Sequence, residues 1–308
     1  MSEDAGVCGL LAIDKPAGMT SHDVVARVRR TLGKRRVGHA GTLDPLATGL
    51  LPCLVGPATR LVRFLHRWPK SYVGVIALGE ETATGDREQL SGSAARPPVP
   101  PAAVLEQACR RLSGRYWQTP PVYSAKKLGG IAAHRLARRG YAPALAPVLV
   151  TVHRLRLVPG RDGRLAFAAR VSSGTYLRAL ARDLGRLLGT GAHLEQLRRT
   201  AVGPVRVREA ISPSAERAAM LAALQPLERI PLQLAAVQLE ERQEAAFRCG
   251  RVVELAADRL RPDIELPAEV RVLGSSRLAG IGDLDLDRRL RPRVVLPVGS
   301  PAGSPVAS

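Results

Sequence analysis

Apolar and polar residues alternate regularly along the first three-quarters of the chain and predict a mixture of strands and helices. Short apolar runs bounded by turn residues are typical of strands, which we expect at residues 7–13, 50–55, 71–78, 148–158 and 164–172. Apolar residues spaced three or four apart predict amphipathic helices, which we expect at residues 21–32, 57–65, 102–112, 174–188, 191–200 and 214–224. Ser21 is the expected N-cap of the first of these helices.

The pattern changes near residue 230. Residues 225–231 have the composition of a boundary, and the short strand-like runs beyond it, at 251–253, 270–273 and 293–296, predict a small β domain. The last ten residues are rich in Gly, Pro and Ser, which favours disorder. We therefore expect three parts, at residues 1–230, 231–298 and 299–308.

Charge is distributed unevenly between these parts. The 308 residues include 46 Lys+Arg and 27 Asp+Glu, for a net charge of +19. Residues 1–230 hold 35 of the basic and 16 of the acidic residues, and residues 231–308 hold 11 of each. The excess is mostly arginine, whose planar fork suits phosphate oxygens. A polyanionic partner explains this distribution, while a generally basic protein with no role in nucleic-acid binding is the alternative.

Residues 119–147 form an unusual segment. It contains Lys126, Lys127, Arg135, Arg138 and Arg139 and has no acidic residue. Long loops inside a compact domain are usually functional or disordered. With a tyrosine near its base, the segment is typical of an arm that closes over RNA, and an insertion without function is the alternative.

The cysteines and the apolar runs bear on cellular location. Cys8, Cys53, Cys109 and Cys249 are far apart in sequence and include no Cys-x-x-Cys pair, which favours reduced thiols and no metal site. The acidic N-terminus does not have the pattern of a signal peptide, and no apolar run approaches the roughly 18 residues of a membrane helix. We expect a cytoplasmic protein without membrane contact.

Residues 37–49 stand out as a candidate for chemistry. They read Val-Gly-His-Ala-Gly-Thr-Leu-Asp-Pro-Leu-Ala-Thr-Gly. Glycines permit tight backbone paths, and the residue before proline favours an extended conformation, so Asp44 can stand at the tip of a loop. An Asp-Pro pair taken alone more often starts a turn. The whole string, however, closely resembles the catalytic loop of the bacterial tRNA pseudouridine synthase B family, which modifies the uridine at position 55 of the T loop.

This resemblance implies a catalytic role for Asp44. Pseudouridine formation breaks a glycosidic C–N bond and joins C5 of the base to the sugar, with no cofactor, and whether Asp44 attacks the base or the sugar or abstracts a proton stays open. Gly174-Thr175-Tyr176-Leu177-Arg178 matches a second family motif. By resemblance Arg178 pairs with Asp44 and keeps it charged, although an arginine on a helix face is ordinarily just solvated.

Four further residues match substrate-binding positions of the family. Tyr72 matches the tyrosine that stacks on the flipped-out base, and Tyr176 and Leu197 match residues that line the uracil pocket. His39 matches a histidine that fills space left by displaced loop bases. Each has an ordinary alternative, which is core packing for the first three and a local hydrogen bond for the histidine. Lys15 belongs to a matching Lys-Pro motif beneath the site, where we expect a structural role.

The resemblance extends from about residue 10 to residue 205 and implies an α+β fold. This fold has a pseudouridine synthase catalytic domain with a mixed, mostly antiparallel central sheet, followed by a small PUA-like β domain. The chain departs from the family at Ala83, where an acidic residue is usual, and at His134, where a tyrosine is frequent. The zero net charge of residues 231–308 predicts few phosphate contacts from the β domain.

We therefore expect an enzyme whose partner is tRNA, bound through its T-arm stem-loop, acting as a monomer with no obligate protein partner. A guide-RNA-dependent rRNA pseudouridine synthase is one alternative, which the basic segment 119–147 argues against. A non-catalytic tRNA-binding chaperone is a second. A basic structural protein of the ribosome is a weaker third, because it needs none of Asp44, Tyr72 and Arg178.

Overall fold

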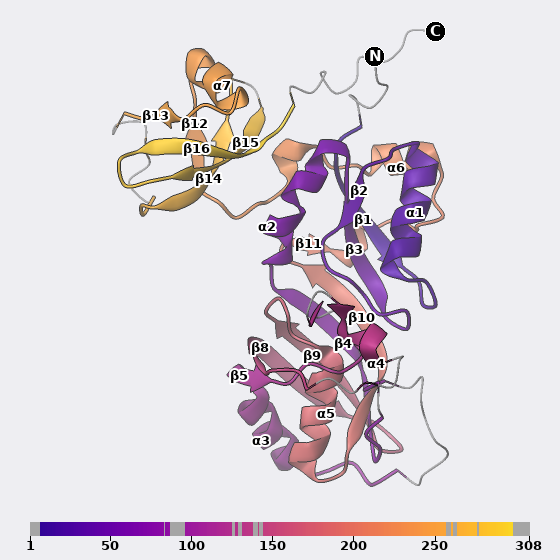
Figure 1. The fold of residues 1–308 in the computed structure, drawn as a ribbon. Coiled ribbons are helices and arrows are strands. Elements are labelled where there is room, and N and C mark those ends of the chain that lie inside the picture. Colours follow the sequence, from indigo (N-terminus) through magenta and orange to yellow (C-terminus); the bar gives the residue numbers. More distant parts are fainter. Residues whose placement is uncertain are drawn as a thin grey trace.

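The structure is a computed structural model, which describes residues 7–82, 84–86, 96–124, 127–128, 131–137, 141, 144–256, 260, 264–275 and 277–297. Figure 1 shows a long body built on one large sheet, with a second, smaller sheet beside one end of it.

The large sheet has nine strands and is mixed, as predicted. Its main path runs β1-β3-β10-β4-β9-β8-β5, with β2 added to β3 and β11 to β10. All neighbouring pairs are antiparallel except β3 and β10, which run parallel over two residue pairs. The strands are β1 Gly9–Lys15, β2 Val37–His39, β3 Thr48–Val55, β4 Lys70–Leu78, β5 Gly114–Gln118, β8 Val148–Pro159, β9 Arg164–Val171, β10 Ala192–Val202 and β11 Val205–Arg206.

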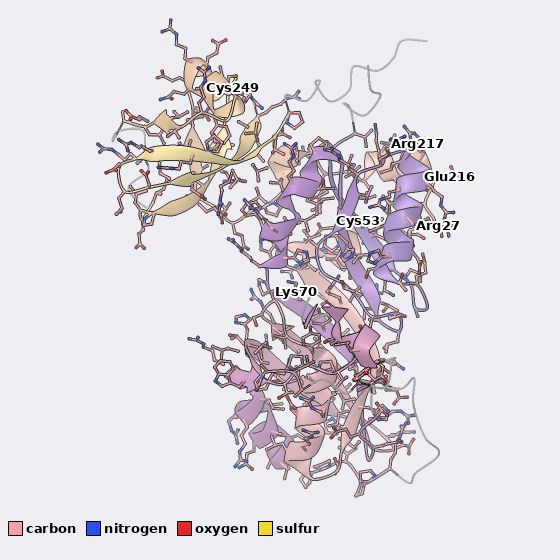
Figure 2. All side chains as sticks on the ribbon, in the orientation of Figure 1. Arg27, Cys53, Lys70, Glu216, Arg217 and Cys249 are labelled. Carbon is pink, nitrogen blue, oxygen red and sulfur yellow. The ribbon has the colours of Figure 1, made fainter. Side chains whose placement is uncertain are left out.

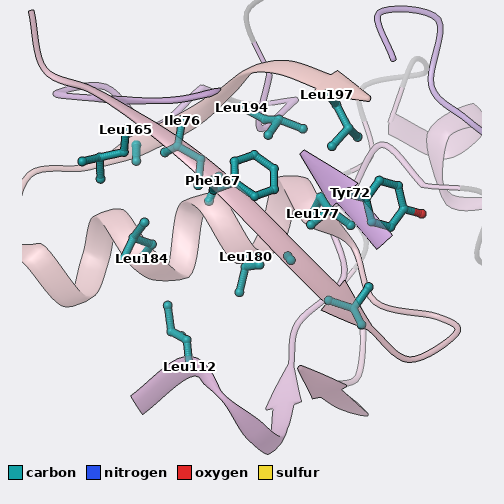
Figure 3. Packing of buried hydrophobic residues seen from close by; sticks show 14 of the residues in the cluster. Tyr72, Ile76, Leu112, Leu165, Phe167, Leu177, Leu180, Leu184, Leu194 and Leu197 are labelled. Carbon is teal, nitrogen blue, oxygen red and sulfur yellow. The ribbon is translucent and has the colours of Figure 1, made fainter. Parts of the chain in front are cut away.

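Helices cover the two ends of this sheet separately. They are α1 Ser21–Leu32, α2 Val62–His66 after a 3₁₀ turn at Gly56–Leu61, α3 Ala102–Leu112, α4 Ala133–Ala137, α5 Leu177–Leu188 and α6 Arg217–Ala222. The predicted apolar face of α1 packs with β1 and β3, and the apolar face of α5 packs with β4, β9 and β10. Figure 3 shows Leu177, Leu180 and Leu184 of α5 facing Phe167 of β9. Burial of these apolar side chains stabilises each end.

Two local predictions are wrong. Residues 191–200 do not form a helix, because they belong to β10, a strand with β3 on one side and β4 on the other. Its hydrogen bonds to two strands override a sequence that has good helix propensity. The N-cap of α1 is Thr20, whose hydroxyl accepts from the backbone N–H of Asp23 at 3.1 Å. The Ser21 side chain bonds elsewhere, to the loop that contains Asp44.

A second sheet lies beyond residue 235, as the strand-like runs predict. Its order is β12-β14-β15-β16-β13, from β12 Ala236–Gln238, β13 Val253–Glu254, β14 Ala268–Leu273, β15 Leu278–Leu284 and β16 Arg289–Val295. Helix α7 Glu241–Arg248, which the sequence reading did not predict, packs on it through Phe247. Leu278, Ile281 and Val294 also belong to a hydrophobic cluster that includes Leu54 and Leu61 of the first region. The second sheet is therefore joined to the first by apolar packing.

Several predictions concern residues that are only partly described. Within the basic segment, the structure describes α4 and a hairpin of β6 Lys127–Leu128 and β7 Ile131–Ala132. Lys126, Arg138 and Arg139, the side chains of Lys127, His134 and Arg135, Ala83 and the tail 299–308 lie outside the description. All four cysteines are free. No helix among the described residues is long and apolar enough to span a membrane.

Candidate active site

The loop between β2 and β3 is fixed on both sides of Asp44. On one side, Leu43 exchanges two hydrogen bonds with the Ser21 hydroxyl, which accepts from the Leu43 N–H at 2.9 Å and donates to its carbonyl at 3.2 Å. On the other side, the fully buried Lys15 ammonium donates to the carbonyl of Pro45 at 3.1 Å. The structural role predicted for Lys15 is confirmed. Because both neighbours of Asp44 are held, its backbone is positioned before any substrate binds.

Arg199 supports the same loop from within the sheet. The residue is 1% exposed, and its guanidinium donates to the carbonyls of Leu50 at 2.7 Å, Gly41 at 2.9 Å and Thr42 at 3.4 Å. Gly49 has φ +99°, and a Cβ there would lie 2.3 Å from the Arg199 carbonyl oxygen. Only glycine allows β3 and β10 to approach this closely.

Arg178 of α5 pairs with Asp44, as predicted. Its Nε lies 2.9 Å from Oδ2 of Asp44, and its Nη2 lies 3.3 Å from Oδ1. The arginine side chain is 8% exposed, whereas the carboxylate is 36% exposed. A two-point contact of this kind fixes the plane of a carboxylate as well as its charge. Asp44 is thus oriented by a buried partner and remains open to a substrate.

Two further donors of Arg178 are also occupied. Nη1 donates to the carbonyl of Thr84 at 2.7 Å, and Nη2 donates to the carbonyl of Tyr123 at 2.9 Å. A second carboxylate, Asp86, is buried with Oδ2 4.0 Å from Nε. Gly85 has φ +74°, and a Cβ there would lie 3.1 Å from Cβ of Arg178. The segment around Thr84 thus packs directly on the arginine and limits its rotation.

Asp44 opens into a cavity of about 580 Å³ that also contains Tyr72, Tyr176, Arg178 and Leu197. In Figure 3 the Tyr72 hydroxyl points away from the packed leucines, while its ring lies beside Leu177. Tyr176 is the last residue before α5, and Gln118 fixes its backbone by accepting from its N–H at 2.9 Å. Four of the predicted site residues therefore surround the carboxylate. A planar base entering this space meets an aromatic ring and apolar side chains.

Basic side chains line the same cavity. Lys70 and Arg199 contribute to its wall together with His66, whose pKa is lowered by burial and by the charges of Lys70 and Arg199. Burial, with the charge of Arg199 second, lowers the pKa of Lys70 to about 8, and its ammonium donates to the His66 carbonyl at 2.6 Å. Figure 2 places Lys70 where the two ends of the body meet. The positive charge suits an anionic substrate that carries phosphates.

His39 lies apart from these residues. It is on β2, opposite Cys53 of β3, and its ring centroid is 6.0 Å from that of His22. It does not line the cavity that contains Asp44. Burial lowers the pKa of His39 to about 4, helped by the nearby His22, His66 and Arg199. The ring is therefore neutral near pH 7 and offers shape rather than charge.

The sequence reading missed three residues of the site. It placed Arg199 on a helix, and it assigned no role to Lys70 or Asp86. The spacing Lys70-Ser71-Tyr72 was a usable signal, because residues two apart on a strand share a face. Nothing comparable pointed to Arg199, whose partners are backbone carbonyls. Among the described residues, no group of three His, Cys, Asp or Glu side chains could hold a metal ion.

Comparison with known proteins defines the class. A model described as "TruB family pseudouridylate synthase (N terminal domain)" matches residues 29–177, and "tRNA pseudouridylate synthase B C-terminal domain" matches residues 178–230. The fold and the family models are those of a pseudouridine synthase. A tRNA pseudouridine synthase B from Parasynechococcus marenigrum is 42% identical over 94% of this chain and 98% of that protein. The chain belongs to the TruB family.

Other relatives support this assignment. A tRNA pseudouridine synthase B from Thermobifida fusca is 50% identical over 66% of this chain and 72% of that protein. Among solved structures, a Cbf5-Nop10-Gar1 complex contains a chain that superposes with a TM-score of 0.69 at 25% identity, covering 94% of this chain and 85% of that chain. The match to the solved chain includes the second sheet as well as the first, because it spans nearly the whole sequence.

Proposed function

We propose that this protein isomerises uridine to pseudouridine at position 55 in the T loop of tRNA, with Asp44 as the catalytic residue. The observation that carries the proposal is the carboxylate itself. It is held by Arg178 at two points and opens into a cavity lined by Tyr72. The names of the relatives, which are tRNA pseudouridine synthases, supply the substrate class.

The geometry assigns each residue a part in the reaction. The target base leaves its stack and enters the cavity, where Tyr72 supports it and Leu197 and Tyr176 limit its movement. Asp44 faces the base and the sugar while the glycosidic bond from C1′ to N1 breaks. The base turns, C1′ bonds to C5, the hydrogen on C5 leaves as a proton, and N1 takes up a proton, so that product and substrate have the same atoms. Redox balance is neutral throughout, so the reaction requires no cofactor.

Arg178 keeps the carboxylate ionised and correctly turned while the base moves. His39, outside this cavity, would contact RNA next to the flipped nucleotide. We infer that the enzyme acts on tRNA as a monomer with no obligate protein partner. Four free cysteines fit a reducing cytoplasm.

The domain division follows from the two sheets. We infer a catalytic domain at residues 1–230 and a PUA-like domain at residues 231–298. Four arginines of the second sheet and its helix pair with carboxylates: Arg293 with Asp283 at 2.7 Å, Arg248 with Glu244 at 2.7 Å, Arg289 with Glu254 and Arg291 with Asp285. This internal pairing supports a small electrostatic contribution from that domain to RNA binding.

Tritium release tests the proposed function. Wild type should release the label from a T-arm stem-loop with tritium on uridine C5, and Asp44→Asn should release none while still binding the RNA. Asp14→Asn is the matched control, because Asp14 also pairs with an arginine, Arg198 at 2.7 Å, but lies outside the cavity. Turnover retained by Asp44→Asn would contradict the mechanism. Tight binding without any release by wild type would favour the chaperone.

A further inference from the structure

The large sheet has a second face that the proposed chemistry does not use. On β9, alternate residues Phe167, Ala169 and Val171 are buried against α5, whereas Ala168 and Arg170 between them are exposed. We call this exposed side of β5, β8 and β9 the outer face. Its members toward the active-site end of these strands are Arg115, Trp117, Leu149, Arg154, Arg156 and Arg170.

Two arginines of the outer face stand directly opposite each other. Arg154 on β8 is the cross-strand partner of Arg170 on β9, and Arg156 follows two residues later on the same side. All three are exposed. Directly opposed side chains lie about 5 Å apart at Cβ, and like charges in that relation destabilise a sheet. The arrangement costs stability unless an anion lies over it.

No anion from the protein does so within the described part of the chain. Arg115, Arg154, Arg156 and Arg170 have no carboxylate within 4.0 Å there. The opposite end of the same strands differs, because Arg164 donates to Glu195 at 2.9 Å. On the strands themselves, the arginines next to the active site therefore lack the carboxylate partner that Arg164 has at the opposite end.

An aromatic side chain completes the surface. Trp117, on the edge strand β5, is 68% exposed, and its cross-strand partner Leu149 is 44% exposed. Exposed tryptophan is costly in water and is suited to stacking on a nucleobase. Arginines for phosphates beside an aromatic platform for bases are the recurring composition of surfaces that bind unpaired RNA.

A groove links the outer face with the catalytic cavity. It has a volume of about 490 Å³ and runs past Leu149 and Val150 of β8 to Ser173, Gly174 and Tyr176. The last three residues also line the cavity that contains Asp44. An RNA strand that leaves the cavity here passes around the start of β8 and reaches Trp117 and the opposed arginines.

We propose that the outer face is a second RNA-binding surface, which binds the part of the substrate RNA lying beyond the stem-loop that presents the uridine. Arg154 and Arg170 bind its phosphates, and Trp117 stacks on one of its bases. The inference rests on the proposed function for the identity of the RNA. It goes beyond the proposed function because it predicts contacts between the outer face and full-length tRNA that an isolated T-arm stem-loop cannot make.

The test compares two RNAs and two double variants. Arg154→Gln with Arg170→Gln removes the opposed pair. Arg161→Gln with Arg164→Gln removes the same charge from the far end of the same hairpin. Dissociation constants for full-length tRNA and for the T-arm stem-loop are measured between 50 and 300 mM salt, a range chosen to give the slope of affinity against salt. Thermal unfolding reports folding, and the Arg154/Arg170 variant should unfold at the same temperature as wild type or higher.

We expect the Arg154/Arg170 variant to bind full-length tRNA about tenfold more weakly, with a salt slope smaller by roughly 1.5, since each phosphate contact contributes about 0.7 to 0.9. Its binding to the stem-loop should change less than twofold, and Arg161/Arg164 should resemble wild type with both RNAs. Trp117→Ala should weaken tRNA binding without changing the slope.

Unchanged binding of tRNA by the Arg154/Arg170 variant, or an equal loss with both RNAs, would overturn the proposal. The tritium assay with wild type tests the proposed function separately, because tritium release reports turnover by the unmodified enzyme and does not involve the Arg154/Arg170 variant. If wild type binds tRNA without turnover and the variant still loses affinity, the second surface stands without the synthase.

Discussion

Arginines on the two faces of the large sheet differ in burial and in their hydrogen-bond partners. On the cavity side, Arg178 and Arg199 are buried, and their donors point at carbonyl and carboxylate oxygens. On the outer face, Arg154 and Arg170 oppose each other in solvent. Burying an unpaired charge has a prohibitive cost in free energy, so the buried arginines on the cavity side require oxygen partners within the chain. The exposed arginines are solvated and remain available to an anion from another molecule.

The largest expected effect comes from breaking the paired side. Arg178→Met should lower turnover of the stem-loop by about two to three orders of magnitude, the size typical of losing one preorganised electrostatic contact. Asp44 would lose both its orientation and its countercharge. Single-turnover tritium release measures this.

Arg182→Met is the matched control for that variant. Arg182 lies one turn along α5 and pairs with Asp183 at 2.8 Å rather than with Asp44. Equal losses in the two variants would mean that the helix, and not the contact to Asp44, determines the rate.

A smaller effect is expected on the free energy of unfolding, which should fall more when a buried arginine of the cavity side is replaced than when an exposed arginine of the outer face is replaced. Arg199→Met leaves three backbone carbonyls without their donor, and each buried unpaired group costs about 1–3 kcal/mol. With partial rehydration, we expect the free energy of unfolding to fall by about 3 kcal/mol in urea denaturation. Arg170→Met on the outer face should change it by less than about 0.5 kcal/mol. Similar losses of unfolding free energy in the two variants would contradict the expected difference between buried and exposed arginines.

The last effect concerns pH and the buried lysine beneath the loop. Burial lowers the pKa of Lys15 to about 8, against the opposing charge of Asp44. Between pH 8 and 10.5 the folded protein has released a proton that the unfolded chain still holds, so unfolding must take up a proton. The free energy of unfolding of wild type, relative to Lys15→Met, should therefore rise with pH in this window, by at most about 1.4 kcal/mol per unit. A flat difference would show that Lys15 stays charged when folded.

The elements that the sequence predicts well are those with a strong local pattern. The apolar face of α1, the helix at 102–112 and the hairpin of β8 and β9 all follow from spacing and turn residues. Strand β10 does not. Leu194 and Leu197 are three residues apart, as on a helix, and the following arginines also favour one. Only pairing with β3 and β4, which come from distant parts of the chain, makes this segment a strand.

The site divides in the same way. Asp44 and Arg178 are 134 residues apart, and only the resemblance to a known family connected them. Arg199 could not be found by reasoning from side-chain chemistry, because its partners are backbone carbonyls whose positions exist only in the folded sheet. The outer face was also hidden. Its arginines contribute to a net charge that the sequence reports, but the register that brings Arg154 opposite Arg170 is a property of the structure.

The placement of Arg199 on β10 has a consequence for synthesis on the ribosome. The loop that carries Asp44 emerges early, but the guanidinium that supports it is 157 residues downstream of Thr42. At about 5–20 residues per second, the loop waits roughly 8–30 s for its support. Neither β3 nor the loop can reach its final position before β10 has left the exit tunnel. The nascent chain is thus inactive until more than two-thirds of it has been translated, because β10 ends at Val202 of 308 residues and must still emerge.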